Sequence, residues 1–495
     1  MNNNSKNIRF IWLTIAVILS LFIGGKWNIP LAAWIAPIFV IRFFRDSDKA
    51  GRNFLLLWIV SAIPTIISWL GATAMSLASP SAEPVFFLLT TPLGLLPYVI
   101  DRMYYRRFGS SAWLTLVYPI AATAMDFFSA TGSPFGTFGA GAYSQRDFLA
   151  MMQIASVTGL WGITFIVSWF ASFMNDLWES GFKFTRLSLT FAGVLALILG
   201  LGFGRTLLAA QAEQSAQIAG FSLPAGKFSE MMRQLNAGDE AGFRQAIDEL
   251  HAQELNQIRE FAQGGANIVV LQEGAGMGYS EQVEELMVDA SALAKEEGIY
   301  IVLPTFDLGK KPAENKVHII DPNGEVVLTH TKYGGNQFEG TLKGDGILQT
   351  VDTPYGKLSA IICWDADFPI TVKQAGEQNV DLLFVPSNDW LEVKDIHAGM
   401  ATFRAVENGM SIFRQTGQGV SSVIDAYGFT INRVDMFKEN TAGFTGIQMI
   451  ETPTDSVDTM YTSTGDAFGW AMQIGLLVLL VNLWLNRKQK ILLSK

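Results

Sequence analysis

The sequence predicts a chain with two kinds of structure: a polytopic α-helical membrane domain and a separate α/β domain. Charged residues make up 16% of the 495 residues and the mean hydropathy is +0.27, whereas a soluble domain is about one-quarter charged. Long apolar runs separated by short polar joints extend to residue 210, and beyond them short apolar strands alternate with amphipathic segments. The formal net charge of −10 argues against a nucleic-acid-binding surface.

Eight apolar runs are candidates for membrane-spanning helices. Seven lie in a first domain that we place at 1–210, and the eighth lies in the segment 466–495. Most approach the ~20 residues that cross a bilayer, and tryptophans lie within or at the edges of several, as in the aromatic belts of membrane proteins. The runs occupy 9–24, 29–44, 54–77, 85–101, 112–130, 148–174, 187–205 and 468–485.

Lysine and arginine residues predict the orientation of these runs. They precede the first run and follow every even-numbered run, whereas the remaining joints carry little beyond Lys26 and Arg146. Because positively charged joints stay in the cytoplasm, we expect both termini there and the domain at 211–465 outside. The basic joints contain Lys6, Arg9, Arg42, Arg45, Lys49, Arg52, Arg102, Arg106, Arg107, Lys183, Arg186, Arg487, Lys488, Lys490 and Lys495.

Residues 211–465 alternate between apolar strands and helices whose apolar residues recur at helical spacing. A domain of this length is large enough to have its own hydrophobic core. The turn Asp321-Pro322-Asn323-Gly324 joins two of the strands as a β-hairpin. We predict strands at 216–221, 267–272, 300–304, 316–321, 325–330, 357–363, 381–386, 411–416 and 421–425, and helices at 239–263, 281–297 and 397–409.

Three chemically reactive side chains each follow a predicted strand. Glu273 follows the strand at 267–272, Lys332 follows the hairpin, and Cys363 ends the strand at 357–363. Cys363 is the only cysteine of the chain, so no internal disulfide can consume its thiol. A carboxylate, an ammonium group and a thiol at strand ends form the set that a Glu–Lys–Cys amide-cleaving or acyl-transferring enzyme needs.

Acyl-transfer chemistry gives each of these side chains a role. We expect Glu273 to take the proton of Cys363 and later to return it. Lys332 would stabilise the negative charge on the carbonyl oxygen, with the backbone N–H of Trp364 as a second donor. Cys363 would hold the acyl group as a thioester, which an incoming amine resolves while water is excluded. Candidate hydrophobic loops for excluding water lie at 274–279, 334–340 and 390–400.

Histidine is the alternative proton acceptor for a cysteine nucleophile. The chain has four histidines, and the sequence around Cys363 is unlike that of the cysteine proteases that use a Cys–His pair. His330 could form such a pair, but we favour a structural or surface position for all four. We expect His251 on a solvent-facing helix, and the remaining two are His318 and His397.

The order and surroundings of these residues resemble the nitrilase (carbon–nitrogen hydrolase) superfamily over residues 215–450. The resemblance implies an αββα sandwich with Glu273, Lys332 and Cys363 as its catalytic triad. It rests on these residues, on Cys363-Trp364-Asp365 with Phe368-Pro369 after it, and on Val385-Pro386-Ser387-Asn388-Asp389-Trp390 and Arg404-Ala405-Val406-Glu407-Asn408-Gly409.

The membrane domain is similar to that of the apolipoprotein N-acyltransferase family. This resemblance implies an enzyme of a bacterial cytoplasmic (inner) membrane that moves a fatty acyl chain from a phospholipid to the N-terminal amine of a diacylglyceryl-cysteine lipoprotein. It implies no cofactor and no metal, and we expect a monomer. The similar segments are Ser133-Pro134-Phe135-Gly136, Tyr143-Ser144-Gln145 and Gly159-Leu160-Trp161-Gly162.

The resemblance also suggests residues that support the triad. Glu339 falls where the superfamily has a second glutamate, and Asp365 takes the place of another acidic residue. The alternative for each is a solvated loop carboxylate. Ser387, Asn388 and Trp390 are candidates for lining the pocket, although Ser387 and Asn388 fit equally as caps at a strand end.

Two further features of the predicted membrane domain are an acidic residue within an apolar run and a glycine-rich joint. Asp126 is ionisable within an apolar run and is therefore a functional candidate. The glycine-rich segment 132–141 lacks the ending of a phosphate-binding loop, so we interpret it as a flexible or re-entrant joint.

A membrane-anchored amidase acting on small extracytoplasmic amides would use the same triad. A transporter or receptor with an inactive nitrilase-like domain is the third possibility, but the runs do not form two symmetric halves.

Overall fold

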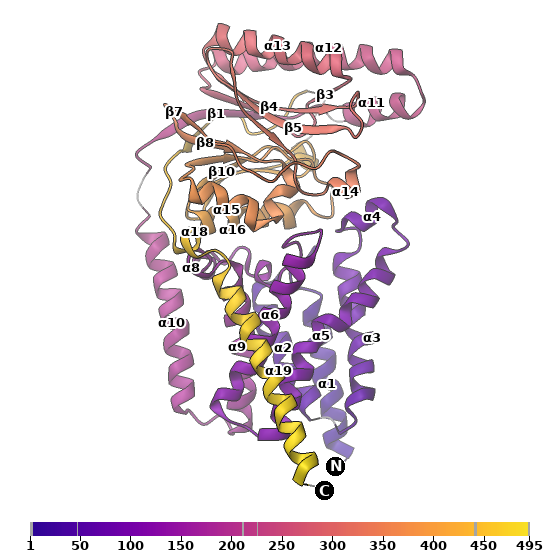
Figure 1. Ribbon diagram of the computed structural model, residues 1–495, viewed down its shortest axis with the longest axis vertical. Helices are drawn as coiled ribbons and strands as arrows, with labels where there is room; N and C mark the ends of the chain where they lie inside the picture. Colours follow the sequence, from indigo (N-terminus) through magenta and orange to yellow (C-terminus); the bar gives the residue numbers. More distant parts are fainter. Residues whose placement is uncertain (1–2, 47, 210–211, 225, 440–442, 494–495) are drawn as a thin grey trace. The chain divides into compact units, whose positions relative to one another are not determined.

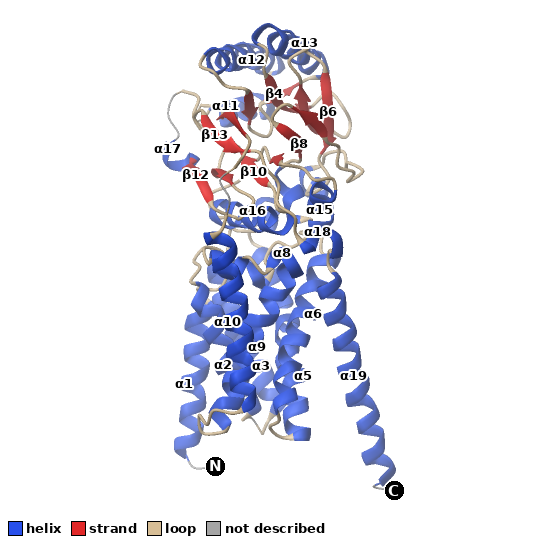
Figure 2. Ribbon diagram, turned by 90° about the vertical axis from the view of Figure 1, so that its left-hand side faces the viewer, coloured by secondary structure: helices blue, strands red, loops and turns tan. Residues whose placement is uncertain are grey.

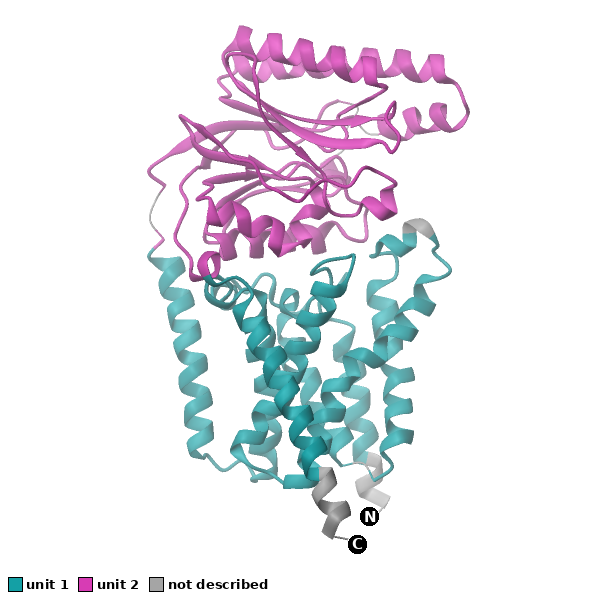
Figure 3. Cartoon of the chain, viewed as in Figure 1, with its two compact units in different colours: residues 1–208, 464–495 teal, residues 209–463 magenta. Residues whose placement is uncertain are grey.

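The computed structural model describes residues 3–46, 48–209, 212–224, 226–439 and 443–493. The chain divides into two compact units, residues 1–208 with 464–495 and residues 209–463 (Figure 3). The first unit is helical, and all strands of the described residues lie in the second. Each unit has its own clusters of buried hydrophobic side chains.

The first unit consists of long helices that run side by side (Figures 1 and 2). These are α1 (Asn3–Ser20), α2 (Pro30–Arg45), α3 (Ala50–Trp69), α5 (Glu83–Phe108), α6 (Val117–Gly132), α9 (Leu160–Glu179), α10 (Arg186–Leu207) and α19 (Ala467–Leu493). Shorter elements connect them: α4 (Ala74–Ala78), η1 (Ala112–Leu116), η2 (Gly141–Gln145), α7 (Leu149–Met152) and α8 (Ala155–Thr158). Helix α6 packs against α5, α9 and α19, and α2 packs against α1, α5 and α9.

Five helical segments of the described residues are long and apolar enough to cross a membrane. They are α3, α5, the continuous η1–α6 segment, α10 and α19. The predicted runs at 9–24 and 29–44 correspond to α1 and α2, and α2 has only 16 residues. By length and composition, the first unit is therefore a multi-pass membrane unit.

Two of the predicted membrane runs are not single helices. The run at 54–77 is divided between α3 and α4. The run at 148–174 is divided between α7, α8 and α9, and Gly159 at the second break has a φ of +62°. This left-handed backbone conformation, which glycine adopts easily, ends α8 instead of continuing it.

A buried ion network joins three helices of the first unit. Arg45 on α2 donates two hydrogen bonds to Asp101 on α5, at 2.7 and 2.8 Å, and lies 3.6 Å from Glu179 on α9. Charges in apolar surroundings are costly unless they are paired. The network explains why Arg45, which belongs to a basic joint in the sequence, is buried in the structure.

The second unit contains two mixed β-sheets. Their strand orders are β13-β1-β2-β4-β5-β6, with β3 beside β4, and β12-β11-β10-β9-β8-β7. The first sheet comprises β1 (Ser215–Phe221), β2 (Ile268–Leu271), β3 (Gly276–Gly278), β4 (Tyr300–Asp307), β5 (Glu314–Ile320), β6 (Val326–Thr331) and β13 (Ile450–Pro453). The second comprises β7 (Val351–Thr353), β8 (Gly356–Ala360), β9 (Leu382–Phe384), β10 (Ser411–Arg414), β11 (Val420–Ile424) and β12 (Thr430–Asp435). Strands β1, β2 and β4 are parallel, as are β8, β9 and β10.

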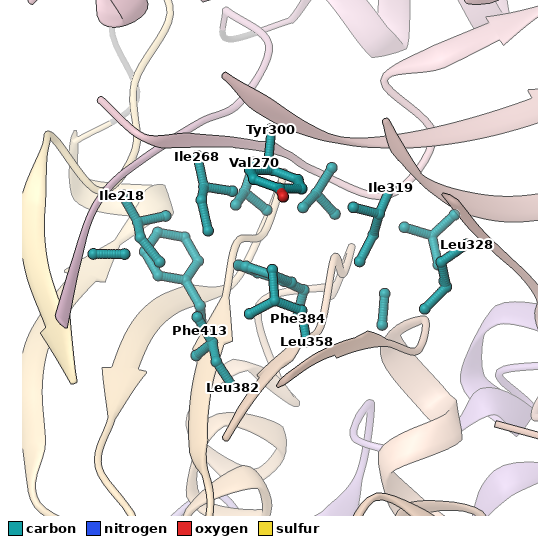
Figure 4. Close-up of a cluster of buried hydrophobic side chains, with 14 of the residues drawn as sticks. Ile218, Ile268, Val270, Tyr300, Ile319, Leu328, Leu358, Leu382, Phe384 and Phe413 are labelled. Atoms are coloured by element: carbon teal, nitrogen blue, oxygen red, sulfur yellow. The ribbon is translucent and has the colours of Figure 1, made fainter. Parts of the chain in front are cut away.

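The two sheets face each other across a hydrophobic core that includes Ile218 and Val270 from one sheet and Phe384 and Phe413 from the other (Figure 4). Alternate strand residues point the opposite way and pack under helices. Helices α12 (Glu240–Gln263) and α13 (Ser280–Glu297) cover the first sheet, and α15 (Pro369–Glu377) and α16 (Lys394–Asn408) cover the second. The predicted αββα sandwich is confirmed. Short helices complete the unit: α11 (Lys227–Asn236), α14 (Asn336–Glu339), α17 (Met436–Glu439) and α18 (Met460–Thr464).

Candidate active site

Cys363 lies at a sharp turn that follows β8. Its backbone N–H donates to the carbonyl oxygen of Pro386 at 2.9 Å, which keeps the chain in the sheet beyond the last strand residue. Cys363 then begins a 3-10 turn, Cys363–Asp367, with a φ of +47°. Positive φ is unfavourable for a residue that has a Cβ, so the surrounding contacts hold Cys363 in this conformation. The residue is 7% exposed and therefore largely shielded from water.

Lys332 is the centre of a buried ion network. Its Nζ donates to Glu273 Oε1 at 2.7 Å and to Glu339 Oε1 at 2.5 Å. Asn315 on β5 donates its Nδ2 to the same Glu273 oxygen at 2.8 Å. The structure thus brings Glu273, Lys332 and Glu339 together. Asn315 was not among the predicted site residues.

The charges around Cys363 favour a protonated thiol at rest. Burial raises the pKa of Cys363, and the Glu273 carboxylate raises it further, against the opposing effects of Lys332 and His397. Burial alone would lower the pKa of Lys332, but the charges of Glu273 and Glu339 raise it well above its usual value. Lys332 is therefore a permanent cation, and the thiol needs a base.

Asp365 links the backbone after Lys332 to the turn that carries Cys363. Its Oδ1 accepts from the N–H groups of Tyr333 at 2.9 Å and Gly334 at 2.7 Å. Its Oδ2 accepts from the N–H of Ile362 at 3.0 Å and lies 2.7 Å from His330 Nε2. A single buried carboxylate therefore links the segment after Lys332 to the turn that carries Cys363.

The segment that carries Glu339 packs closely against Trp364. Gly335 has a φ of +79°, and a Cβ there would lie 2.4 Å from the Trp364 ring. The Phe338 ring is stacked on Trp364, with centroids 5.6 Å apart and an interplanar angle of 14°. The aromatic pair and the glycine hold this segment against the residue that follows Cys363.

His397 on α16 lies beside Cys363 and acts to lower the pKa of its thiol, a neighbour that was not predicted. The thiol sulfur, a His397 ring nitrogen and an Asp389 oxygen lie within 4.8 Å of one another. Nδ1 of His397 is 2.7 Å from Asp389 Oδ1, and Nε2 is 3.1 Å from Asp367 Oδ1. Arg414 on β10 donates to Asp389 Oδ2 at 2.8 Å.

Cys363, Asp389 and His397 are grouped as metal ligands would be. However, both ring nitrogens of His397 are hydrogen-bonded to carboxylates, and the guanidinium of Arg414 is paired with Asp389. A positive guanidinium on a ligand carboxylate opposes the binding of a second cation. We therefore interpret the group as a hydrogen-bonded charge network.

Two protein families match the chain. The carbon-nitrogen hydrolase family matches residues 232–447, and the apolipoprotein N-acyltransferase N-terminal domain matches residues 11–173. The apolipoprotein N-acyltransferase of Geobacter metallireducens is 23% identical over 93% of this chain and 92% of its own length. That of Borreliella burgdorferi is 23% identical over 87% of this chain and 86% of its own length. The chain is therefore similar to apolipoprotein N-acyltransferases in both of its units.

Both resemblances inferred from the motifs are thereby confirmed, the nitrilase-like one and the apolipoprotein N-acyltransferase one. Among solved structures, an amidase from Nesterenkonia sp. is 19% identical, with a TM-score of 0.39, and covers 53% of this chain and 97% of the amidase.

The candidate pocket-lining residues that follow β9 make mainly backbone contacts. Ser387 Oγ donates to the carbonyl oxygen of Val385 at 3.0 Å, and Asn388 Oδ1 accepts from the N–H of Gln418 at 3.1 Å. These are the contacts expected of residues that cap a strand end. Trp390 begins the turn that precedes α16. The neighbouring Asp389, which was not predicted as a site residue, has the contact with His397.

Each of the three segments predicted as water-excluding loops contains a helix or a strand. Residues 274–279 contain β3, which pairs with β4 and is buried. Residues 390–400 contain the first turns of α16, where Ile396 and Met400 are buried. Residues 334–340 contain the short helix α14, and within this segment residues 334–336 are buried whereas Phe338 is exposed. The apolar residues and glycines of 274–279 suggested a membrane-facing loop, because a strand of only three residues shows no detectable alternation of apolar and polar side chains.

His251 is buried, so the prediction that it faces solvent was wrong. Its Nε2 lies 3.0 Å from the carbonyl oxygen of Met277, and burial lowers the pKa of His251 to about 4. Helix α11 and strand β3 cover this side of α12, which widens the apolar face beyond what the sequence periodicity suggests.

Asp126 in the membrane unit anchors the glycine-rich joint. It accepts from the N–H of Gly141 at 3.0 Å and from the hydroxyl of Thr164 at 2.8 Å. Beyond the joint, Gln145 accepts from the Trp34 indole N–H at 2.8 Å. These contacts give Asp126 a structural task and tie the joint 132–141 to α6 and α9.

Proposed function

We propose that this protein is an N-acyltransferase of lipoprotein maturation. It would move a fatty acyl chain from a phospholipid, through a thioester on Cys363, to the N-terminal amine of a diacylglyceryl-cysteine lipoprotein. The observation that carries the proposal is the Glu273–Lys332 pair, 2.7 Å apart, next to the chain's only cysteine. The relatives named apolipoprotein N-acyltransferase, which match this chain across both of its units, support the proposal.

In the first half-reaction, Glu273 takes the proton of the Cys363 thiol, and the sulfur attacks the acyl ester carbonyl of the phospholipid. The ammonium group of Lys332 and the backbone N–H of Trp364 would stabilise the resulting oxyanion. The C–O bond then breaks, and Glu273 returns the proton to the departing alcohol. The products are a thioester on Cys363 and a lysophospholipid.

In the second half-reaction, the lipoprotein amine attacks the thioester carbonyl. Glu273 accepts a proton from the amine, the C–S bond breaks, and the proton passes to the Cys363 thiolate. Lys332 serves both steps because its buried charge, held by Glu273 and Glu339, persists when Glu273 is protonated. Glu339 is therefore proposed as the residue that keeps Lys332 in place throughout the cycle.

We place the enzyme in a bacterial cytoplasmic membrane, with both termini in the cytoplasm and the second unit outside. The distribution of basic residues supports this orientation. A phospholipid donor and a lipid-modified acceptor are both held in the membrane, which accords with the five long apolar helices of the described chain.

The test is direct observation of the acyl-enzyme. Purified protein incubated with phospholipid is expected to gain the mass of one acyl chain on the peptide that contains Cys363. A diacylglyceryl lipopeptide added afterwards should remove that mass and appear acylated. The matched variants are Cys363→Ser, which cannot form a thioester, and Lys332→Met, which should slow adduct formation by about 10²–10³.

An amidase would give the opposite result in this experiment. An amidase would release ammonia from small amides and would leave a lipopeptide unmodified. Ammonia release together with no acyl adduct on folded protein would refute the acyltransferase proposal.

A further inference from the structure

We infer that His397 is a second cationic partner of the Cys363 sulfur and stabilises its thiolate form from the side of the second sheet. The inference rests on the proposed function in one respect, that Cys363 is the nucleophile. It goes beyond that function because a Glu–Lys–Cys mechanism leaves His397 without a task.

The geometry provides the first reason. His397 belongs to α16, and one of its ring nitrogens lies within 4.8 Å of the sulfur of Cys363, which begins the 3-10 turn. The thiol is thereby held between two cations that come from different parts of the fold. Lys332 follows β6 in the first sheet, whereas His397 lies on the helix that covers the second sheet.

The second reason is the charge state of the ring. Burial favours a neutral imidazole, but the carboxylates of Asp367 and Asp389 raise the pKa of His397 well above its usual value. Each ring nitrogen faces one of these carboxylates, at 3.1 and 2.7 Å, and only an imidazolium can donate from both nitrogens. His397 is therefore an imidazolium at neutral pH.

The remaining charges near the ring do not cancel this effect. Arg414 from β10 pairs with Asp389 at 2.8 Å and lies 3.4 Å from the ring. Arg404, on the same helix as His397, is paired with Glu407 at 2.9 Å and also acts on Asp367. The charges of Arg414 and His397 outweigh burial and lower the pKa of Asp389, whereas burial raises the pKa of Asp367 despite the opposing charges of His397 and Arg404.

This arrangement defines what His397 does in the reaction. Glu273 takes the thiol proton, and the negative sulfur is then stabilised by Lys332 and His397 together. When the thioester C–S bond breaks, the same two cations stabilise the departing thiolate until Glu273 returns the proton. His397 itself keeps both of its protons, so it is a positioning residue and not a general base.

The experiment uses the full chain and needs no acyl donor. Because Cys363 is the only cysteine, the mass gained from iodoacetamide reports on this thiol alone. The alkylation rate is measured against pH for the wild type, for His397→Asn, and for His251→Asn as a matched control. His251 is also buried, but its Nε2 is bonded to the carbonyl oxygen of Met277.

We expect His397→Asn to move the midpoint of the alkylation curve up by about one pH unit and to slow alkylation near neutral pH by about tenfold, since loss of a nearby cation disfavours the thiolate. His251→Asn should leave the midpoint unchanged. An unchanged midpoint in folded His397→Asn overturns the inference, whether or not an acyl adduct forms on the wild type.

A second measurement covers a variant that fails to fold. Histidine-labelled wild-type protein is followed by NMR, with resonances assigned from His→Asn variants at the other three positions. The His397 ring is expected to remain an imidazolium at alkaline pH, where free histidine is neutral. A neutral His397 ring under those conditions overturns the inference.

Discussion

Lys332 has no exposed surface, and a buried ammonium group persists only when its charge is paired and its protons are hydrogen-bonded. Glu273 and Glu339 meet both needs in this site. The sequence predicted Glu273 and Lys332 because each follows a strand or hairpin, whereas Glu339 was suggested by the resemblance to the nitrilase superfamily. Asn315 and His397 were not predicted, because Asn inside a strand and His on a helix look the same whether structural or functional. Their roles depend on partners that are distant in the sequence.

The first prediction at the residue scale concerns Asp365. Asp365→Ala removes the acceptor for the N–H groups of Tyr333, Gly334 and Ile362 at once. Because the Lys332 segment and the Cys363 turn then lose their common anchor, acyl-adduct formation should slow by about a hundredfold. Asp365→Asn keeps one acceptor oxygen and should lose less.

The matched control for this variant is Asp321→Ala. Asp321 also accepts backbone N–H groups, those of Asn323 and Glu325, but in a hairpin turn away from the site. It should lower the melting temperature without slowing adduct formation. Wild-type rates in folded Asp365→Ala would contradict the positioning role.

A second residue-scale prediction concerns Glu254 on α12. Both carboxylate oxygens are buried without a hydrogen-bond partner, and burial raises the pKa of Glu254 well above its usual value. The folded state therefore binds a proton that the unfolded chain releases above its ordinary pKa, so this group costs stability as pH rises. Glu254→Gln should raise the melting temperature near neutral pH by roughly 2–4 °C.

The pH dependence is the decisive part of this prediction. Below the unfolded-state pKa, Glu254 is protonated in both states, so the gain from Glu254→Gln should vanish in acid. The control is Glu249→Gln on the same helix, an exposed residue bonded only to Gln245, which should change little. A Glu254→Gln gain that is independent of pH would point to packing and not to ionisation.

At the scale of elements, all nine strands and three helices predicted in the second unit are present, with ends shifted by a few residues. They combine clear apolar periodicity with turn residues at their ends. Strands β3, β7, β12 and β13 were missed. Two of these have three residues, too few to display alternation, and β12 and β13 are edge strands with exposed residues. Their pairing is determined by neighbouring strands and not by their own composition.

The element-scale prediction concerns the two glycines that flank α14. Gly335 and Gly340 have φ values of +79° and +70°, so alanine is strained at both positions. Only at Gly335 would the added Cβ meet the Trp364 ring, whereas nothing lies within 4 Å at Gly340. Gly335→Ala should displace Glu339 from Lys332 and slow adduct formation at least about a hundredfold.

Gly340→Ala serves as the matched control, because it introduces the same backbone strain without the clash. It should cost stability of about 1 kcal/mol and leave most of the activity. Equal losses of activity in the two variants would mean that strain alone, and not the contact with Trp364, determines the position of Glu339.

At the scale of the whole molecule, the chain combines a helical membrane unit with an α/β unit. The division was visible in the sequence because apolar runs of membrane length differ so clearly from alternating strands. The sequence could not anticipate the interruption at Gly159 or the burial of Arg45. The first depends on a local backbone conformation, and the second depends on Asp101, which is supplied by another helix.

The final prediction tests the orientation of the chain in the membrane. Cys363→Ser leaves a chain without cysteine, so a single new cysteine can be labelled without background. Asp48 and Glu240 suit this purpose, because their side chains are 71% and 60% exposed and take part only in surface ion pairs, which contribute little stability. Asp48 lies in a basic joint, and Glu240 lies in the second unit.

In intact spheroplasts, a membrane-impermeant maleimide should label Glu240→Cys and should spare Asp48→Cys, and both should react after lysis. The physical reason is the cytoplasmic retention of the positively charged joints. The reverse pattern would place Cys363 on the cytoplasmic side. An acceptor lipoprotein exposed on the outer side could then never reach the thioester, so this labelling experiment tests the topology and the proposed acceptor together.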